Sequence, residues 1–365
     1  MSHQNNKDAE LTSIRDQIDE LDSSLLGIIN QRISLAKQIG DIKQSISGDS
    51  AIIYRPEREA QVIRRLTQEN NGALNSEQIN LIFREVMSIC RGAEARLQIA
   101  VLGPKGTFTE IAALQQFGSS VEIALHDRID QIFNAVETGN ANYGVVPVEN
   151  STEGIVNVTA DLLASTSLII AGEILLPIHQ SFLSTHTELS KIQKVFSHAQ
   201  SFAQCRMWLQ DTLPGVEIEN VSSNAVAAEM AANCEGCAAI ASENAAAQYG
   251  LNVLANRIED NKQNTTRFLV LSRESVASSG KDKTSLLMSC KNEPGSLFKL
   301  LKPLHDHGVS MLKIESRPSK TKRWEYLFFV DIEGHHTDPA IKPALDAVEA
   351  AAGYFRILGA YPSAN

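Results

Sequence analysis

The sequence predicts a multidomain protein with an all-α helical N-terminal domain, a two-lobed α/β central domain and a C-terminal ferredoxin-like βαββαβ domain. Three observations lead to this prediction. A chain of 365 residues is too long for one core of ordinary size. Helical periodicity stops near Arg96, where short apolar strands begin. The serine-rich, charged composition of residues 273–283 then predicts a linker. The predicted domains span 6–97, 98–275 and 284–362.

The composition narrows the functional classes. Hydrophobic residues make up 43% of the chain and charged residues 21%, as in a folded globular protein. The net charge of -10 disfavours nucleic acid and anionic membranes as partners, because both require a basic surface. No apolar stretch is long enough to span a bilayer, and the first ten residues lack the apolar core of a signal peptide. We therefore expect a cytoplasmic protein that binds small molecules.

The five cysteines are scattered and odd in number, which predicts unpaired thiols in a reducing compartment. Cys234 and Cys237 form one CxxC motif that follows an alanine-rich helix ending at Gly236. The motif has no second pair and no neighbouring histidine to complete a tetrahedral zinc site. We favour two small buried apolar residues over a metal or redox role, and we expect no metal and no cofactor.

The first predicted helix carries a coiled-coil seam, because its apolar residues alternate in steps of three and four. These residues are Leu11, Ile14, Ile18, Leu21, Leu25, Ile28, Leu35, Ile39, Ile42 and Ile46. Arg32 stands where the seam requires an apolar residue, so it either sets the register or meets an anionic ligand. Both interpretations remain open from the pattern alone.

Two shorter helices follow, one beginning at Pro56 and one capped by Ser76. A helix as long as the first has too little to pack against within about ninety residues. We therefore expect it to pair with a second subunit.

The central region alternates buried strands with helices. The strands are predicted at 99–103, 143–148, 168–176, 194–197, 237–242 and 267–272. The polar clusters GPKGTFTE, ENSTEG, SHAQSFAQC and SENAA follow several strands directly. Residues in such places line ligand crevices, where the free N–H groups of helix N-termini favour anions. After the linker, the order strand, helix, strand, strand, helix, strand predicts the βαββαβ unit.

These motifs together resemble the bifunctional chorismate mutase and prephenate dehydratase family, which makes phenylpyruvate for phenylalanine synthesis. GPKGTFTE, VPVENSTEG, SHAQSFAQC and NTTRF occur in the order typical of that family. The C-terminal unit is similar to an ACT domain, with EPGSLF and ESRP where the family senses phenylalanine. The resemblance implies chorismate and prephenate as substrates, phenylalanine as an allosteric inhibitor, and a homo-oligomer that is at least a dimer.

The resemblance assigns roles in the helical domain. Lys43, Arg32 and Glu94 are implied to be catalytic. The further implied substrate contacts are Arg15, Arg55, Arg58, Glu59 and Cys90. Three positions depart from the best-known family pattern: Arg55 stands where relatives carry an aspartate, Cys90 where they carry a serine, and Glu94 where a glutamine or glutamate binds the ether oxygen. Chorismate rearranges within one molecule, so this site need only hold the folded conformer and stabilise charge on the ether oxygen.

In the central domain the resemblance ties Thr266 to dehydration. Its hydroxyl is a poor acid, but it can donate a hydrogen bond to the departing hydroxide. The implied substrate contacts are Glu149, Asn150, Ser197, Gln204 and Arg267, with capping or fold roles left open for Asn150 and Ser197. Arg267 either anchors a carboxylate or braces its strand. A lone histidine such as His198 is more often structural than a general base.

In the ACT-like unit the implied phenylalanine contacts are Gly295, Ser296, Leu297, Phe298, Glu315, Ser316, Arg317 and Pro318. One alternative from another class remains. A non-catalytic sensor would bind an amino acid or keto acid in the two-lobed unit and signal through the ACT-like unit to a partner. Conversion of chorismate through prephenate to phenylpyruvate by the purified chain separates the two hypotheses.

Overall fold

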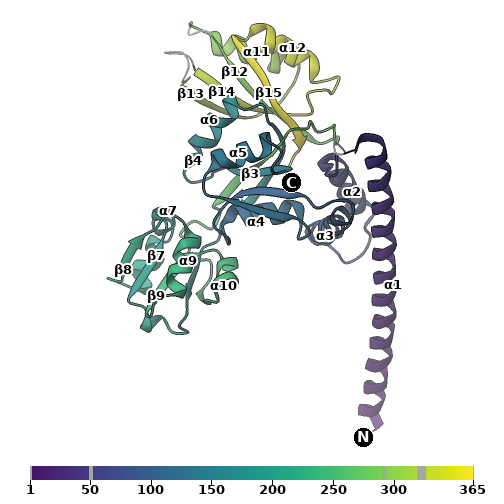
Figure 1. Cartoon of the computed structure of the whole chain (residues 1–365), viewed down its shortest axis with the longest axis vertical. Coiled ribbons are helices and arrows are strands. Elements are labelled where there is room, and N and C mark those ends of the chain that lie inside the picture. The colour runs from purple at the N-terminus through teal and green to yellow at the C-terminus, as the bar shows by residue number, and fades with distance from the viewer. Residues whose placement is uncertain (1, 49–51, 291–292, 319–325, 365) are drawn as a thin grey trace.

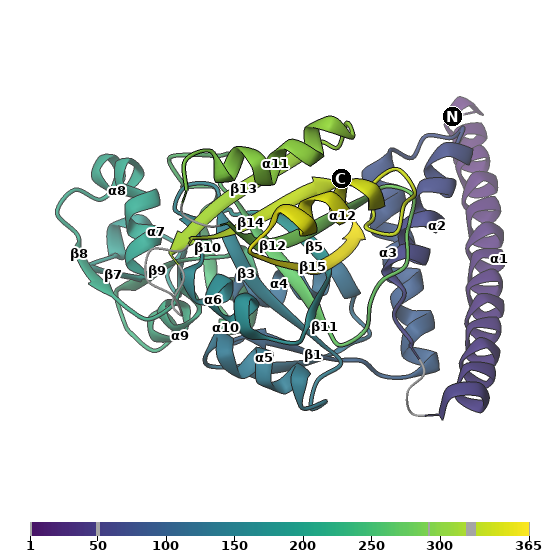
Figure 2. The ribbon, with the colours of Figure 1, turned by 90° about the horizontal axis from the view of Figure 1, so that it is seen from above.

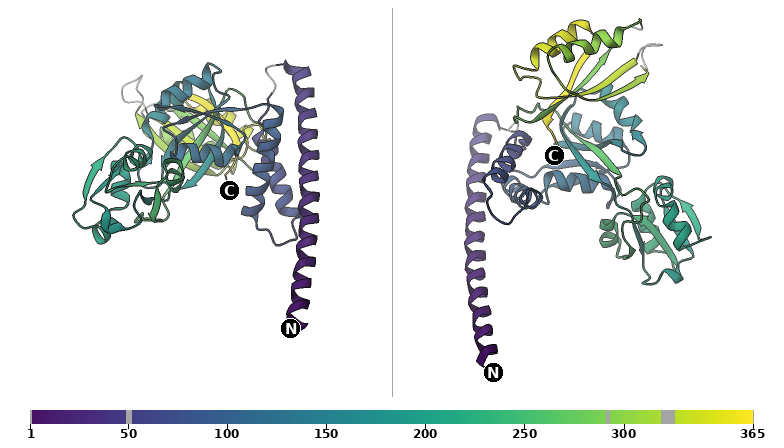
Figure 3. Two further views of the ribbon diagram at one scale, coloured as in Figure 1. Left: turned by 60° about the horizontal axis from the view of Figure 1, so that its bottom comes forward. Right: turned by 180° about the vertical axis from the view of Figure 1, so that it is seen from behind.

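The computed structural model describes residues 2–48, 52–290, 293–318 and 326–364 (Figure 1). It contains the predicted helical region, the two-lobed α/β region and the C-terminal α/β unit. In the two-lobed region, lobe 1 consists of residues 98–177 and 265–272, and lobe 2 consists of residues 181–255. Lobe 2 and the long first helix lie on opposite sides of lobe 1 (Figure 3). None of the helices described is both long and apolar enough to cross a membrane.

The helical domain consists of α1 (Ser2–Ser47), α2 (Pro56–Glu69) and α3 (Ser76–Glu94). The N-terminal half of α1 extends away from the rest of the chain (Figure 1). Pro56 begins α2, as predicted. The predicted cap of α3 was wrong by one residue. Ser76 is the first helical residue, and Asn75 caps the helix by accepting a hydrogen bond from the Gln78 amide at 2.8 Å.

Lobe 1 is built on a mixed sheet with the strand order β2-β1-β3-β11-β5. Its strands are β1 (Gln98–Leu102), β2 (Glu122–His126), β3 (Tyr143–Asn150), β5 (Ile169–Pro177) and β11 (Thr265–Ser272), with β4 (Gly154–Ile155) paired to β3. The lobe also contains α4 (Phe108–Phe117), α5 (Ile129–Glu137) and α6 (Asn157–Ser165). β11 runs antiparallel to both of its neighbours, so it lies inside the sheet although it comes last in the chain.

Lobe 2 is inserted between β5 and β11. Its strands are β6 (Ser181–Ser184), β7 (Lys194–Ser197), β8 (Glu217–Asn220), β9 (Cys237–Ala241) and β10 (Asn252–Ala255), in the order β10-β6-β9-β7-β8. Its helices are α7 (Ala199–Gln204), α8 (Arg206–Thr212), α9 (Asn224–Ala232) and α10 (Glu243–Tyr249), and Leu189–Lys191 form a 3-10 turn. The two chain segments that join the lobes lie side by side, since the Ile178 amide donates to the Asn264 carbonyl at 2.8 Å.

The C-terminal domain is the predicted βαββαβ unit. It comprises β12 (Asp282–Ser289), α11 (Ser296–Asp306), β13 (Met311–Pro318), β14 (Tyr326–Glu333), α12 (Lys342–Ala351) and β15 (Tyr354–Pro362), with the strand order β13-β14-β12-β15. One face of its sheet shares a core with lobe 1, in which Leu287 and Leu358 lie with Ile170 and Leu269 (Figure 2).

The segment 273–283 is not a free linker. Arg64 of α2 donates to the Ser279 carbonyl at 3.0 Å, and Lys283 lies in β12 with its ammonium 2.8 Å from the Glu173 carboxylate. Ser278 and Ser279 both bond to Asp282, so the polar composition here reflects specific contacts at a domain junction rather than flexibility.

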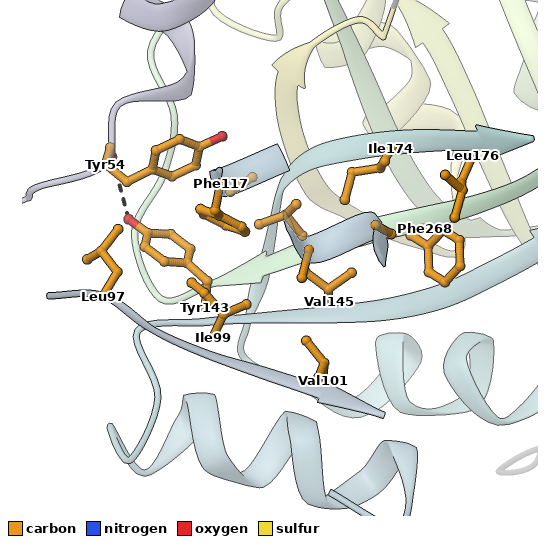
Figure 4. Close-up of a cluster of buried hydrophobic side chains, with 14 of the residues drawn as sticks. Tyr54, Leu97, Ile99, Val101, Phe117, Tyr143, Val145, Ile174, Leu176 and Phe268 are labelled. Atoms are coloured by element: carbon orange, nitrogen blue, oxygen red, sulfur yellow. Dashed lines mark hydrogen bonds between the residues drawn. The ribbon is translucent and has the colours of Figure 1, made fainter. Parts of the chain in front are cut away.

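Aromatic residues join the helical domain to lobe 1 (Figure 4). Tyr54 precedes α2 and packs against Phe117 and Tyr143 with ring centroids 4.8 and 5.3 Å apart. Burial, with a smaller contribution from nearby Glu59, raises the pKa of Tyr54 to about 12. The two domains therefore share one apolar core.

The prediction that all five cysteines are unpaired was wrong. Cys234 and Cys237 form a disulfide, with Cα atoms 5.4 Å apart. Gly236 between them has a φ of +71°, which turns the chain back from the end of α9 into β9. Cys237 is buried as expected, whereas Cys234 is partly exposed. Cys90, Cys205 and Cys290 are free thiols.

Candidate active sites

Thr266, near the N-terminal end of β11, lies beside Asn150, the last residue of the neighbouring strand β3. The Asn150 Nδ2 donates to the Thr266 Oγ1 at 2.9 Å. The Asn150 Oδ1 accepts from the amides of Thr152 and Glu153 at 3.0 and 3.3 Å, which holds the turn that follows β3. Because Asn150 donates to the threonine oxygen, the threonine hydrogen is left to donate to another group. This pair can therefore offer one directed hydrogen bond to a leaving oxygen.

Glu149 and Arg267 point to the opposite face of the same strands. The Glu149 carboxylate is 2.5 Å from the Lys313 ammonium of β13. The guanidinium of Arg267 donates to Glu173, Asp331 and Tyr361 at 2.8, 2.6 and 2.9 Å. Of the two roles considered for Arg267, these contacts match the bracing of its strand.

Lobe 2 presents a connected group of buried and partly buried polar side chains. Ser197 is fully buried, and its Oγ lies 3.0 Å from the Ile240 carbonyl and 3.1 Å from the Asn224 Oδ1. Gln180 donates to Ser201 and to Gln204 at 3.2 and 3.4 Å. We refer to Gln180, Ser197, Ser201, Gln204 and Asn224 as the lobe 2 polar group. Gln180 and Asn224 were not identified from the sequence because neither lies in one of the family motifs.

His198 has a capping role in the structure. Its Nδ1 accepts a hydrogen bond from the Gln200 amide at 3.3 Å at the start of α7. This contact agrees with the expectation that the residue is structural. A general-base role is not needed to account for its position.

The GPKGT loop of lobe 1 contacts lobe 2 directly. The Ser242 Oγ donates to the Gly106 carbonyl at 3.1 Å, and the Tyr249 hydroxyl donates to the Lys105 carbonyl at 2.9 Å. Gly106 has a φ of +87°, and a Cβ there would lie 3.6 Å from Ala245. The loop therefore joins the two lobes at a place separate in sequence from the connecting segments.

A buried carboxylate ties the two connecting segments together. Glu259 is 3% exposed and accepts from the Gln180 amide at 2.9 Å. Its other oxygen lies 2.8 Å from the His179 Nδ1. Since Gln180 also belongs to the lobe 2 polar group, the connection between the lobes and the candidate site share one residue.

In the helical domain, α1 and α3 bring four predicted site residues together as two pairs. The Arg32 guanidinium donates to the Cys90 Sγ at 2.7 Å, and the Lys43 ammonium donates to the Glu94 carboxylate at 3.0 Å. Gly40 lies between these pairs, and a Cβ there would be 3.2 Å from the Glu94 side chain. The close approach of the helices places all four side chains along the contact between α1 and α3.

Glu59 of α2 is held by Arg91 of α3, a residue that the sequence did not single out. The Arg91 guanidinium donates to the Glu59 carboxylate and to the Phe117 carbonyl, and lies 5.0 Å from the centroid of the Tyr54 ring. Burial raises the pKa of Glu59, while Arg91 acts in the opposite direction. Arg91 directly follows Cys90 on α3, and this position in the sequence was the signal that could have identified it.

The remaining predicted mutase residues lie at the surface. Arg15 is exposed on the extended part of α1, and Arg58 is exposed on α2. Arg55 is 51% exposed and lies 3.5 Å from Glu57. None of these three meets Arg32 or Lys43 through a contact within the described residues.

The predicted phenylalanine motifs lie at the start of α11 and in β13. Gly295 has a φ of +78° and precedes the first helical residue. Leu297 and Phe298 are 38% and 69% exposed, and Leu312 and Ile314 of the edge strand β13 are also exposed. Arg317 instead faces lobe 1, where it lies 3.1 Å from Asp161 of α6.

Comparisons with known proteins match all three regions. Residues 14–95 match chorismate mutase type II, residues 99–276 match prephenate dehydratase, and residues 284–350 match the ACT domain. The bifunctional chorismate mutase/prephenate dehydratase of Neisseria gonorrhoeae is 47% identical over 96% of each chain. The protein of the same name from Pseudomonas aeruginosa is 43% identical over 97% of this chain and 98% of its own.

A solved structure supports the same conclusion. Prephenate dehydratase from Arthrobacter aurescens, in complex with L-Phe, is 34% identical, covers 73% of this chain and 90% of its own, and has a TM-score of 0.67. These matches define an enzyme with two catalytic domains and one regulatory domain. The chain belongs to the bifunctional chorismate mutase/prephenate dehydratase family. They do not favour the alternative of a non-catalytic sensor.

Proposed function

We propose that the chain converts chorismate to prephenate in its helical domain and prephenate to phenylpyruvate in its two-lobed domain, with phenylalanine as feedback inhibitor. The observation that carries the dehydratase assignment is the 2.9 Å hydrogen bond from Asn150 to the hydroxyl of Thr266. The purified chain should form phenylpyruvate from chorismate, and added phenylalanine should slow the second step. Absence of either conversion would contradict this proposal. Because its substrates are metabolic intermediates, we also propose a cytoplasmic location.

Dehydration requires the ring hydroxyl of prephenate to leave together with carbon dioxide. In the proposed mechanism the Thr266 hydroxyl donates to the departing oxygen, with Asn150 fixing its orientation. The lobe 2 polar group, in which Gln204 and Asn224 are partly exposed, supplies further hydrogen bonds from the other lobe. The gain in aromaticity supplies much of the driving force, so no strong acid is needed.

The mutase site holds a dicarboxylate through its guanidinium and ammonium groups. Arg32 suits a bidentate carboxylate, and Lys43 suits the ether oxygen as a compact charge. Arg15 lies about 25 Å from Arg32 along α1, at about 1.5 Å per residue. One helix cannot bring both side chains to the same small substrate. We therefore propose that Arg15 serves the site of a second copy.

The exposed seam of α1 supports this dimer. The ten seam residues from Leu11 to Ile46 are each about half exposed or more. Pairing with the same stripe of another chain would remove this apolar surface from water, as in a coiled coil. The edge strand β13, with Leu312 and Ile314 exposed, offers a second contact between copies, at which phenylalanine would bind.

Leu21→Glu should convert the dimer to a monomer and lower the mutase rate at least tenfold, leaving the dehydratase within about twofold. Leu21 is 68% exposed, and a carboxylate there would be desolvated in the paired seam. Sedimentation and both activities measure the effect. Ser23→Glu is the matched control, because it adds the same charge on the outer side of α1. A monomer with full mutase activity would exclude a shared site.

Glu94→Gln should raise mutase kcat/KM. The Glu94 carboxylate is paired with the Lys43 ammonium at 3.0 Å. A carboxylate repels the negative charge that develops on the ether oxygen, whereas the glutamine amide can donate a hydrogen bond to it. The test is mutase kcat/KM for both proteins. An unchanged kcat/KM would remove Glu94 from this role.

A further inference from the structure

The strand pair that carries the dehydratase site has a different partner on each face. Thr266 and Asn150 contact each other on one face. On the other face, Arg267 and Glu149 reach the C-terminal domain. Because adjacent side chains of a strand point to opposite faces, Thr266 and Arg267 lie on opposite faces of the sheet. The site and the regulatory domain therefore lie on the two sides of the same short stretch of sheet.

A β-bulge turns Glu149 toward the regulatory domain. In the pairing of β11 with β3, Arg267 is opposite Glu149 and Phe268 is opposite Pro147, which leaves Val148 as an extra residue. Val148 already faces the core shared with the C-terminal domain. The bulge interrupts the alternation and places Glu149 on that same face. It also interrupts the β3–β11 ladder just beside Thr266, so this end of β11 relies on its regular pairing with β5 and on side-chain contacts.

Those contacts come from charged groups of the C-terminal domain. Asp331 of β14 accepts from Arg267 at 2.6 Å, with both side chains almost buried. Burial alone lowers the pKa of Arg267, but Tyr361, Asp331 and Glu173 raise it, so the guanidinium stays charged. Lys313 of β13 meets Glu149. The Arg267–Asp331 pair is largely shielded from water, which strengthens it, whereas the side chains of Lys313 and Glu149 are 22% and 33% exposed.

The strand that supplies Lys313 also carries the candidate phenylalanine motif. Lys313 lies two residues before Glu315, on the same face of β13. At the other end of the motif, Arg317 lies 3.1 Å from Asp161 and donates to the Asn157 carbonyl at 2.7 Å. β13 is therefore attached to lobe 1 on both sides of Glu315.

We propose that Lys313 and Asp331 are positioning residues for the dehydratase, which act through Glu149 and Arg267 to hold Thr266 in register with Asn150. Glu149 and Arg267 then bind the regulatory domain rather than prephenate. A rearrangement of β13 at the phenylalanine motif reaches Thr266 through these two ion pairs. This inference rests on the proposed dehydratase function of Thr266.

A charge exchange between Glu149 and Lys313 tests the proposal. Lys313→Glu places two carboxylates together and should lower dehydratase kcat at least tenfold, with KM within about twofold and the mutase unchanged. Adding Glu149→Lys should restore kcat to within about threefold of wild type, because the pair is re-formed with its charges exchanged. If Glu149 binds prephenate instead, the double variant stays as inactive as Glu149→Lys alone, and the proposal is wrong.

Two control variants and one further measurement complete the test. Lys313→Arg should keep activity and phenylalanine inhibition, and Lys342→Ala, at an exposed lysine of the same domain, should change neither. Hydrogen exchange at 264–268 reports the register without using activity: it should speed up in Lys313→Glu and recover in the exchanged pair. Unchanged exchange in Lys313→Glu would overturn the inference even in an active enzyme. The wild-type chain could lack dehydratase activity while exchange at 264–268 still speeds up in Lys313→Glu and recovers in the exchanged pair. That result would overturn only the proposed function.

Discussion

Thr266→Ala should lower the dehydratase rate about a hundredfold while leaving the mutase rate and the thermal stability near those of wild type. The variant removes one hydrogen bond to charge that develops in the transition state, which corresponds to roughly 3 kcal/mol. Thr266 lies near the N-terminal end of β11. Among the contacts described, its side chain bonds only to Asn150, so loss of the hydroxyl should disturb the fold little. Steady-state kinetics with prephenate and with chorismate measure the two activities separately.

The neighbouring threonine is a matched control for this experiment. Thr265 is the adjacent residue of β11, and its hydroxyl donates to the Gln263 carbonyl at 3.3 Å instead of meeting Asn150. Thr265→Ala should therefore keep the dehydratase rate within about threefold. Thr266→Ser retains the hydroxyl and should recover most of the activity. Equal losses in Thr265→Ala and Thr266→Ala would show that the strand end, and not the Thr266 hydroxyl, matters.

Arg91→Ala should destabilise the helical domain and its junction with lobe 1 by about 3–5 kcal/mol. Arg91 is 5% exposed and joins Glu59, the Phe117 carbonyl and the Tyr54 ring. Its removal leaves a buried carboxylate and a carbonyl without their cationic partner. The first thermal transition, followed by calorimetry, is the relevant measurement, because a chain of several domains does not unfold in one step.

Arg65→Ala provides the comparison for Arg91. Arg65 lies on α2 and faces Glu69 at 3.9 Å, but its side chain is 60% exposed, so its loss should cost at most about 1 kcal/mol. In the double variant Arg91→Met with Glu59→Leu, no buried charge remains, and part of the lost stability should return. If the double variant is no more stable than Arg91→Ala, the ion pair is not the source of the effect.

The sequence predicted those features that depend on local pattern. The buried strands and the βαββαβ order follow from short apolar runs, and Pro56 begins its helix as expected. The motif residues Thr266 and Asn150 are brought together because their strands are neighbours in the sheet. In the helical domain, charges placed on α1 and α3 meet as pairs, as shown by Lys43 with Glu94.

Other features depend on contacts between distant segments and could not be read from pattern. The bulge at Val148 reverses the face on which Glu149 lies, and alternation counted along β3 does not reveal it. Gln180 joins the lobe 2 polar group only because the connecting segment passes beside α7. The polar stretch 273–283 resembles a flexible linker, yet its serines bond to α2 and to Asp282. In each case tertiary contacts decided the outcome.

The position of β11 in the sheet has a consequence for how the protein is made. β11 lies between β3 and β5, but the ribosome must synthesise all of lobe 2 before it reaches Thr265. Until then the sheet of lobe 1 lacks an interior strand, and β3 and β5 cannot pair across the gap. Lobe 2, whose strands are contiguous in the chain, can fold during synthesis, whereas lobe 1 must wait. The strand that completes lobe 1 is also the one that carries Thr266, so no shorter nascent chain can possess the dehydratase site.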